Sequence, residues 1–109
     1  MLAFHPERER VWRLSFIGEF YADDNCFFKM EEDQKKLPPG ERTLIVDIRK
    51  LEGISSSGQE ILPHFFGRMR SHGFQKANLV AKRQQKDVAR TFERVLDQVF
   101  GPDGTISLE

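Results

Sequence analysis

The sequence has little that could cross-link the chain, anchor it in a membrane or give it a net charge. Cys26 is the only cysteine among 109 residues, which excludes an internal disulfide and fits a reducing compartment such as the cytoplasm. The sequence shows no signal peptide and no apolar run long enough to span a bilayer, so we expect no membrane insertion. Seventeen basic residues balance seventeen acidic ones, which argues against general nucleic-acid binding.

A length of 109 residues predicts one domain, and ten phenylalanines supply apolar area for its core. Within this domain, three short segments of the first half of the chain have the patterns of strands. Residues 2–4 and 11–17 predict an N-terminal hairpin, joined by a polar turn over residues 5–10. Residues 43–48 are almost continuously apolar, which predicts a central strand covered on both faces. Asp47 interrupts this strand, so it should lie near the end of the sheet or have a partner.

Helical patterns alternate with further strands in the rest of the chain. We expect helices from Asp23 or Asp24 to about residue 36, from 57 to 72 and from 85 to 100. Residues 77–81 predict another core strand, and 105–108 leave room for a short one. The fold class is therefore α/β, with a mixed, mostly parallel sheet of four to five strands, an N-terminal hairpin and about three helices.

A cluster of three serines lies at the turn between the central strand and the second helix. Open α/β sheets place their binding sites at the carboxyl edge, where such turns lie. A helix N-terminus also stabilises negative groups such as phosphate. Ser57 and Glu60 have the spacing of a capping box, which predicts that the Ser57 hydroxyl caps the helix.

Two turns of this chain resemble motifs of the STAS domain, the module shared by sulfate transporters and anti-sigma factor antagonists. That family has an Ile-Asp-Ser-(Ser/Thr/Gly)-Gly loop, and the matching positions are Ile54, Ser56, Ser57 and Gly58. Ser55 stands where the family has an acid. The stretch from Gly18 to Tyr21 is similar to an earlier Gly-Glu-Leu-Asp turn, with Tyr21 in place of the acid. The resemblance covers about residues 11–99.

The resemblance implies a regulatory binding module and not an enzyme. It aligns Ser56 with the phosphoacceptor of the family, and the partner would be an anti-sigma factor or a serine kinase-like protein. The surface around the phosphoacceptor would include Glu19, Asp23, Ser55, Ser57 and Gly58. An alternative is an accessory subunit that docks on a transporter ATPase without phosphorylation. Neither role needs a cofactor, and the sequence leaves open whether the domain forms a dimer.

The remaining polar clusters have simple structural explanations. Asp23 and Asp24 could hold a divalent ion, but a helix cap accounts for them more simply. The three histidines are dispersed and give no metal-ligand spacing. Ser56 and His64 lie about 12 Å apart along one helix, too far for a nucleophile and its base. The basic segment 82–86 is either a solvated loop or a contact to an acidic partner or a nucleotide phosphate.

Overall fold

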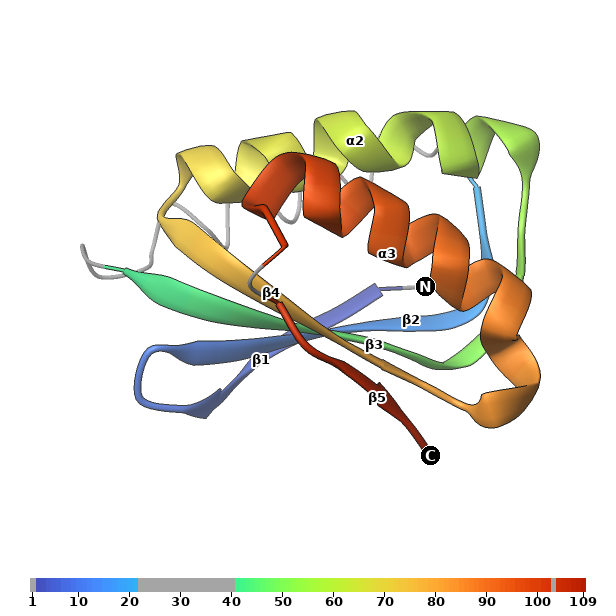
Figure 1. The fold of residues 1–109 in the computed structure, drawn as a ribbon, viewed down its shortest axis with the longest axis horizontal. Coiled ribbons are helices and arrows are strands. Elements are labelled where there is room, and N and C mark those ends of the chain that lie inside the picture. Colours follow the sequence, from blue (N-terminus) through green and yellow to red (C-terminus); the bar gives the residue numbers. More distant parts are fainter. Residues whose placement is uncertain (1, 22–40, 103) are drawn as a thin grey trace.

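The structure, a computed structural model, describes residues 2–21, 41–102 and 104–109 (Figure 1). The described elements are strands β1 (Leu2–Arg8), β2 (Val11–Phe20), β3 (Arg42–Ile54), β4 (Phe74–Ala81) and β5 (Ile106–Leu108), helices α2 (Ser56–Ser71) and α3 (Lys86–Phe100), and the short 3-10 helix Arg83–Gln85. The helix expected from Asp23 or Asp24 to residue 36 falls outside the described residues.

The five strands form one sheet in the order β1-β2-β3-β4-β5. β1 runs antiparallel to β2, and the other neighbouring strands are parallel. The predicted N-terminal hairpin and mostly parallel sheet are therefore confirmed. β3 lies at the centre of the sheet, as the continuous apolar run over residues 43–48 predicts.

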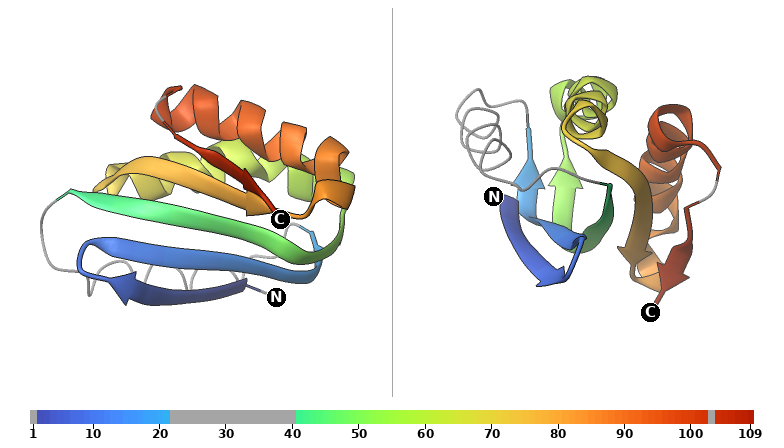
Figure 2. Two further views of the ribbon diagram at one scale, coloured as in Figure 1. Left: turned by 60° about the horizontal axis from the view of Figure 1, so that its bottom comes forward. Right: turned by 90° about the vertical axis from the view of Figure 1, so that its left-hand side faces the viewer.

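Helices α2 and α3 both pack on the same face of the sheet (Figures 1 and 2). Leu44, Val46 and Ile48 point to this face and are fully buried. The expectation that β3 is covered by helices on both faces is wrong for the described residues. Asp47 points to the opposite face, where Arg13 and Arg49 shield its carboxylate. The prediction of a partner for Asp47 is thus confirmed, and we call this opposite side of the sheet the open face.

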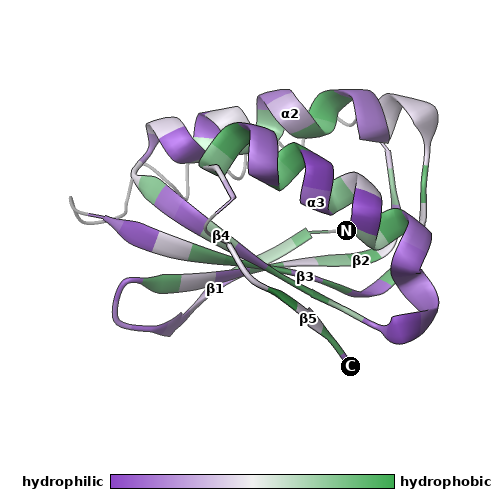
Figure 3. Ribbon diagram, in the orientation of Figure 1, coloured by the Kyte–Doolittle hydropathy of each residue, from purple (hydrophilic) through white to green (hydrophobic). Residues whose placement is uncertain are grey.

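Aromatic side chains join the helices to the sheet. The ring centroid of Phe16 on β2 lies 5.1 Å from that of Phe92 on α3, and Phe66 on α2 is fully buried beside both. Apolar and polar residues alternate along α3, which follows its predicted amphipathic pattern (Figure 3). Edge-to-face ring packing of this kind adds stability beyond burial alone. These ring contacts join α2 and α3 to β2 and to each other.

The hairpin is longer than the sequence pattern predicts. β1 continues to Arg8, so the expected polar turn over residues 5–10 shrinks to Glu9 and Arg10, with Arg10 at a φ of 64°. An edge strand tolerates Pro6 and polar side chains because one side of its backbone needs no partner strand. β2 also continues beyond Gly18, which adopts a φ of 75° next to a shift in register with β3. After this shift, the last residue of β2, Phe20, pairs with the last residue of β3, Ile54.

Candidate functional site

β2 and β3 end side by side at the carboxyl edge of the sheet. Phe20 is the register partner of Ile54, and the backbone N–H of Ser55 donates to the Phe20 carbonyl over 3.0 Å. This hydrogen bond fixes the point at which the chain leaves β3 and enters α2. We call residues 55–58 the serine loop.

Ser55 caps helix α2. Its backbone is extended, with φ −74° and ψ 165°, and its hydroxyl accepts a hydrogen bond from the Gly58 N–H at 3.0 Å. The predicted cap, Ser57 with Glu60, is wrong because Ser57 is already the second residue of the helix. The Ser57 hydroxyl instead lies 3.0 Å from the Ser55 hydroxyl, within hydrogen-bond distance. A serine at the cap satisfies a backbone donor that the helix leaves unpaired.

Ser56 is the serine of the loop whose hydroxyl is not engaged. It is the first residue of α2 and is exposed, and its side chain makes no hydrogen bond with any described residue. The first turn of α2 contains no acidic residue, so nothing there offsets the positive end of the helix dipole. The hydroxyl is therefore accessible at a position that favours a negative group.

Gly58 is required by close packing. It is buried, and a Cβ atom at this position would lie 2.8 Å from the Phe20 carbonyl oxygen and 3.1 Å from the Ile54 side chain. Any larger residue would push the first turn of α2 away from the ends of β2 and β3. The glycine thus places the serine loop against the sheet edge, which is a structural role.

Of the other predicted site residues, one lies at the carboxyl edge of the sheet and the rest fall outside the described residues. Glu19 is exposed on β2, where its register partner is Gly53, so it lies at the same edge as the serine loop. Asp23 and Asp24 fall outside the described residues. Tyr21 stands where the Gly-Glu-Leu-Asp turn of the STAS family has its acid, and the sequence gives it no other role. It directly follows β2 and is 55% exposed. An aromatic side chain this exposed beside the loop is an additional candidate contact.

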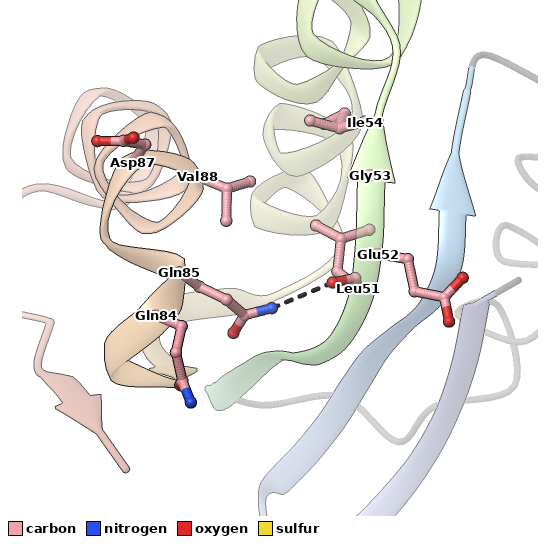
Figure 4. A pocket seen from close by; sticks show the side chains of 8 residues that line it. All are labelled: Leu51, Glu52, Gly53, Ile54, Gln84, Gln85, Asp87 and Val88. Carbon is pink, nitrogen blue, oxygen red and sulfur yellow. Dashed lines mark hydrogen bonds between the residues drawn. The ribbon is translucent and has the colours of Figure 1, made fainter.

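A pocket of about 300 Å³ lies next to the serine loop, between the end of β3 and the start of α3 (Figure 4). Gln85 borders it and donates from its amide to the carbonyls of Ile48 and Leu51, at 2.7 and 3.1 Å. The sequence gives no sign of this role, because the contacts join residues at least 34 positions apart. Gln85 thereby fastens the basic segment 82–86 to the central strand.

The charges around this pocket do not suit a phosphate. Its charged lining residues are Glu52 and Asp87, both acidic. Lys82, Arg83 and Lys86 are exposed but do not line the pocket. The nucleotide alternative for segment 82–86 therefore finds no support in this pocket, while contact of these side chains with an acidic partner stays open.

Comparison with known proteins identifies the fold. No family model matches the sequence, and no curated protein matches it. A solved structure does match: a protein of the DUF3478 family from Shewanella loihica PV-4, described as uncharacterized and as having a SpoIIAA-like fold. The two structures superpose with a TM-score of 0.62, over 100% of this chain and 84% of that one, at 15% sequence identity.

This chain has a SpoIIAA-like fold. That is the fold of STAS domains and anti-sigma factor antagonists, so the fold expected from the serine loop is confirmed. An identity of 15% establishes the fold alone. Among the described residues, no three His, Cys, Asp or Glu side chains gather as metal ligands, and no helix is long and apolar enough to cross a membrane.

Proposed function

We propose that this domain binds a protein partner through the carboxyl edge of its sheet and that phosphorylation of Ser56 ends the binding. The partner would be an anti-sigma factor or a serine kinase-like protein in the cytoplasm. The domain would be the substrate of the kinase and would catalyse no reaction itself. One observation carries the proposal: of the three loop serines, Ser55 and Ser57 engage each other and the helix, while Ser56 is exposed and its side chain makes no hydrogen bond within the described part of the chain.

The surroundings of Ser56 support a protein contact. Tyr21 is exposed at the end of β2, and the preceding residue, Phe20, accepts the hydrogen bond from the Ser55 N–H. Glu19 lies at the same edge. Exposed tyrosines contribute strongly to interfaces because they bury a large rigid area and retain a hydrogen-bonding hydroxyl. The SpoIIAA-like fold is in keeping with a binding module.

A phosphate at Ser56 should affect the partner and not the fold. Phosphoserine carries about −1.5 to −2 charges near neutral pH, and at a helix N-terminus this charge is stabilised. A partner surface that accepts a neutral hydroxyl would have to desolvate the phosphate, which is unfavourable. The switch therefore acts by repelling the partner from an unchanged domain.

Replacing Ser56 by aspartate tests this proposal. The partner is first captured from the native host with the wild-type domain, identified by mass spectrometry and then purified. We expect Ser56→Asp to melt within a few degrees of wild type and to bind the partner at least about tenfold more weakly in titration calorimetry, a loss of roughly 1.4 kcal/mol. Ser56→Ala should bind like wild type and no longer respond to the kinase.

Ser71→Asp is the matched control, because it adds the same charge at the opposite, exposed end of α2. It should leave partner binding unchanged. Equal weakening by both aspartates would mean that net charge and not the loop is responsible. Tight binding by Ser56→Asp would refute the phosphorylation switch and leave docking without phosphorylation, as on a transporter ATPase, as the better account.

A further inference from the structure

A second hollow, of about 280 Å³, lies on the open face, away from the serine loop. Its floor is formed by small side chains: Ala3 on β1 is the register partner of Ser15 on β2. Longer side chains border this floor on β1, β2 and β3. They are His5, Arg13, Ile17, Asp47, Arg49 and Lys50. The hollow therefore follows from the sequence, because two small neighbours lie among long ones on a pleated surface.

The lining carries more positive than negative charge. Arg13, Arg49 and Lys50 are cationic, and Asp47 is the single acid among the lining residues. The two oxygens of Asp47 accept four hydrogen bonds, from Nη1 of Arg13 at 2.7 Å and from the backbone N–H, Nε and Nη2 of Arg49 at 2.8 to 3.0 Å. Its acceptor capacity is thus fully used within the protein. What remains in the hollow is mainly hydrogen-bond donors.

Both arginines retain donors that point to no described residue. A guanidinium has five N–H groups. Arg13 uses one on Glu7 and one on Asp47, and Arg49 uses two on Asp47 and one on Glu109. Glu7 and Glu109 pair with these arginines but do not line the hollow. The Glu109 side chain is 57% exposed, so its ion pair is readily exchanged for another anion.

Two further polar groups complete the donor set. The half-buried Ser15 hydroxyl on the floor and the exposed Lys50 ammonium on the rim have no partner among the described residues. Asp47 holds both guanidinium groups in place before any ligand arrives, so little side-chain ordering is needed on binding. Guanidinium, ammonium and hydroxyl donors around one space are the groups that bind oxyanions.

We propose that the hollow over Ser15 binds a small doubly charged oxyanion, a phosphate or sulfate group, between Arg13, Arg49 and Lys50. Two negative charges are needed because the anion competes with Glu7 and Glu109 for the arginines. A cavity of about 280 Å³ also leaves space for a small organic group attached to the oxyanion. The site is independent of Ser56, which is the first residue of α2 and does not line the hollow.

The test is an NMR titration of the isotope-labelled chain with inorganic phosphate, and separately with sulfate, against sodium chloride at equal ionic strength. We expect saturable shifts at the Ser15 and Lys50 amides and at the Arg13 and Arg49 Nε–H groups, with none from chloride. Lys50→Gln should weaken binding by about two- to fivefold, within the range of one exposed ion pair. Ser15→Val, which removes the hydroxyl and keeps a strand-favouring shape, should weaken it as well.

Lys76→Gln is the matched control. Lys76 is an exposed lysine on β4 whose register partner is Thr43, so it shares the open face but does not line the hollow. Its loss should leave the dissociation constant unchanged. The proposal is overturned if neither anion gives a saturable shift, if the shifts appear only at the Ser56–Gly58 amides, or if Lys50→Gln and Lys76→Gln behave alike.

Discussion

The two faces of β3 show how one strand supports two kinds of surface. Toward the helices, Leu44, Val46 and Ile48 are fully buried and pack without polar partners. Toward the open face, Asp47 is 7% exposed and is held by Arg13 and Arg49. The first face derives its stability from apolar burial, which does not depend on pH. The second depends on charges and responds to acid, salt and anions.

The largest difference between the faces should appear when an apolar side chain is truncated. Phe66 is fully buried among rings of α2, α3 and β2, so Phe66→Ala should cost about 3 to 5 kcal/mol of unfolding free energy. Ile45 lies on the open face and is partly exposed, so Ile45→Ala should cost about 1 kcal/mol. Chemical denaturation of both variants measures the difference. Equal costs would mean that the open face is packed like the core.

The next effect concerns the charges of the open face. Burial opposes the ionisation of Asp47, but hydrogen bonds from Arg49 and Arg13 outweigh burial and lower the pKa of its carboxyl group. Asp47→Asn removes that charge and leaves both arginines poorly paired. We expect a loss of about 2 kcal/mol at neutral pH, below the value for a fully buried pair because both arginines are partly exposed.

The loss on replacing Asp47 should depend on pH with a definite sign. Because the folded-state pKa is lowered, the stabilisation is present above the unfolded-state pKa of about 3.9 and disappears as the pH falls through the lower, folded-state pKa. The gap between wild type and Asp47→Asn should therefore shrink as the pH is lowered below about 4. Glu109→Gln, at an exposed pair, should cost less than about 0.5 kcal/mol. A gap that stays constant in acid would show that Asp47 acts by packing and not by charge.

The smallest effect is the difference in stability between alanine variants of the serine loop, which lies at the carboxyl edge of the sheet and belongs to neither face. Ser55→Ala removes the helix cap and should cost about 1 kcal/mol, whereas Ser57→Ala should cost less than about half of that. Thermal melts of both variants and of Ser56→Ala decide the order. A larger loss for Ser57→Ala than for Ser55→Ala would mean that Ser57, paired with Glu60, caps the helix, which would contradict the observed geometry.

The predictable part of this fold is the part that local pattern determines. The apolar periodicity of α3 and the glycine after each helix place both helices close to their observed bounds. The continuous apolar run places the start of β3, but this strand continues six residues beyond the predicted end, to Ile54. The extra length of β1 was missed because polar residues on an edge strand look like a turn. The face of β3 that no described helix covers is not predictable from the sequence, because Ile45 makes the run appear apolar on both sides and Arg13 lies 34 residues from Asp47.

The candidate site was predictable in position and not in detail. A serine cluster after a core strand indicates the carboxyl edge of the sheet, and Gly58 is where close packing needs a glycine. Which serine caps α2 depends on where β3 ends, and that is set by the Ser55 N–H bonding to Phe20, 35 residues earlier. Three consecutive serines give no local signal for this choice. The contacts of Gln85 likewise depend on tertiary structure.

Localisation of phosphate on the protein isolated from its native host tests the central claim most directly. Peptide fragmentation by mass spectrometry distinguishes Ser55, Ser56 and Ser57, and samples taken as growth conditions change would capture both states of a switch. The account predicts a single phosphate at Ser56, because this hydroxyl is exposed and not used by the helix. Phosphate only at other serines, such as Ser15, Ser71 or Ser107, or none after treatment with the cognate kinase, would contradict it.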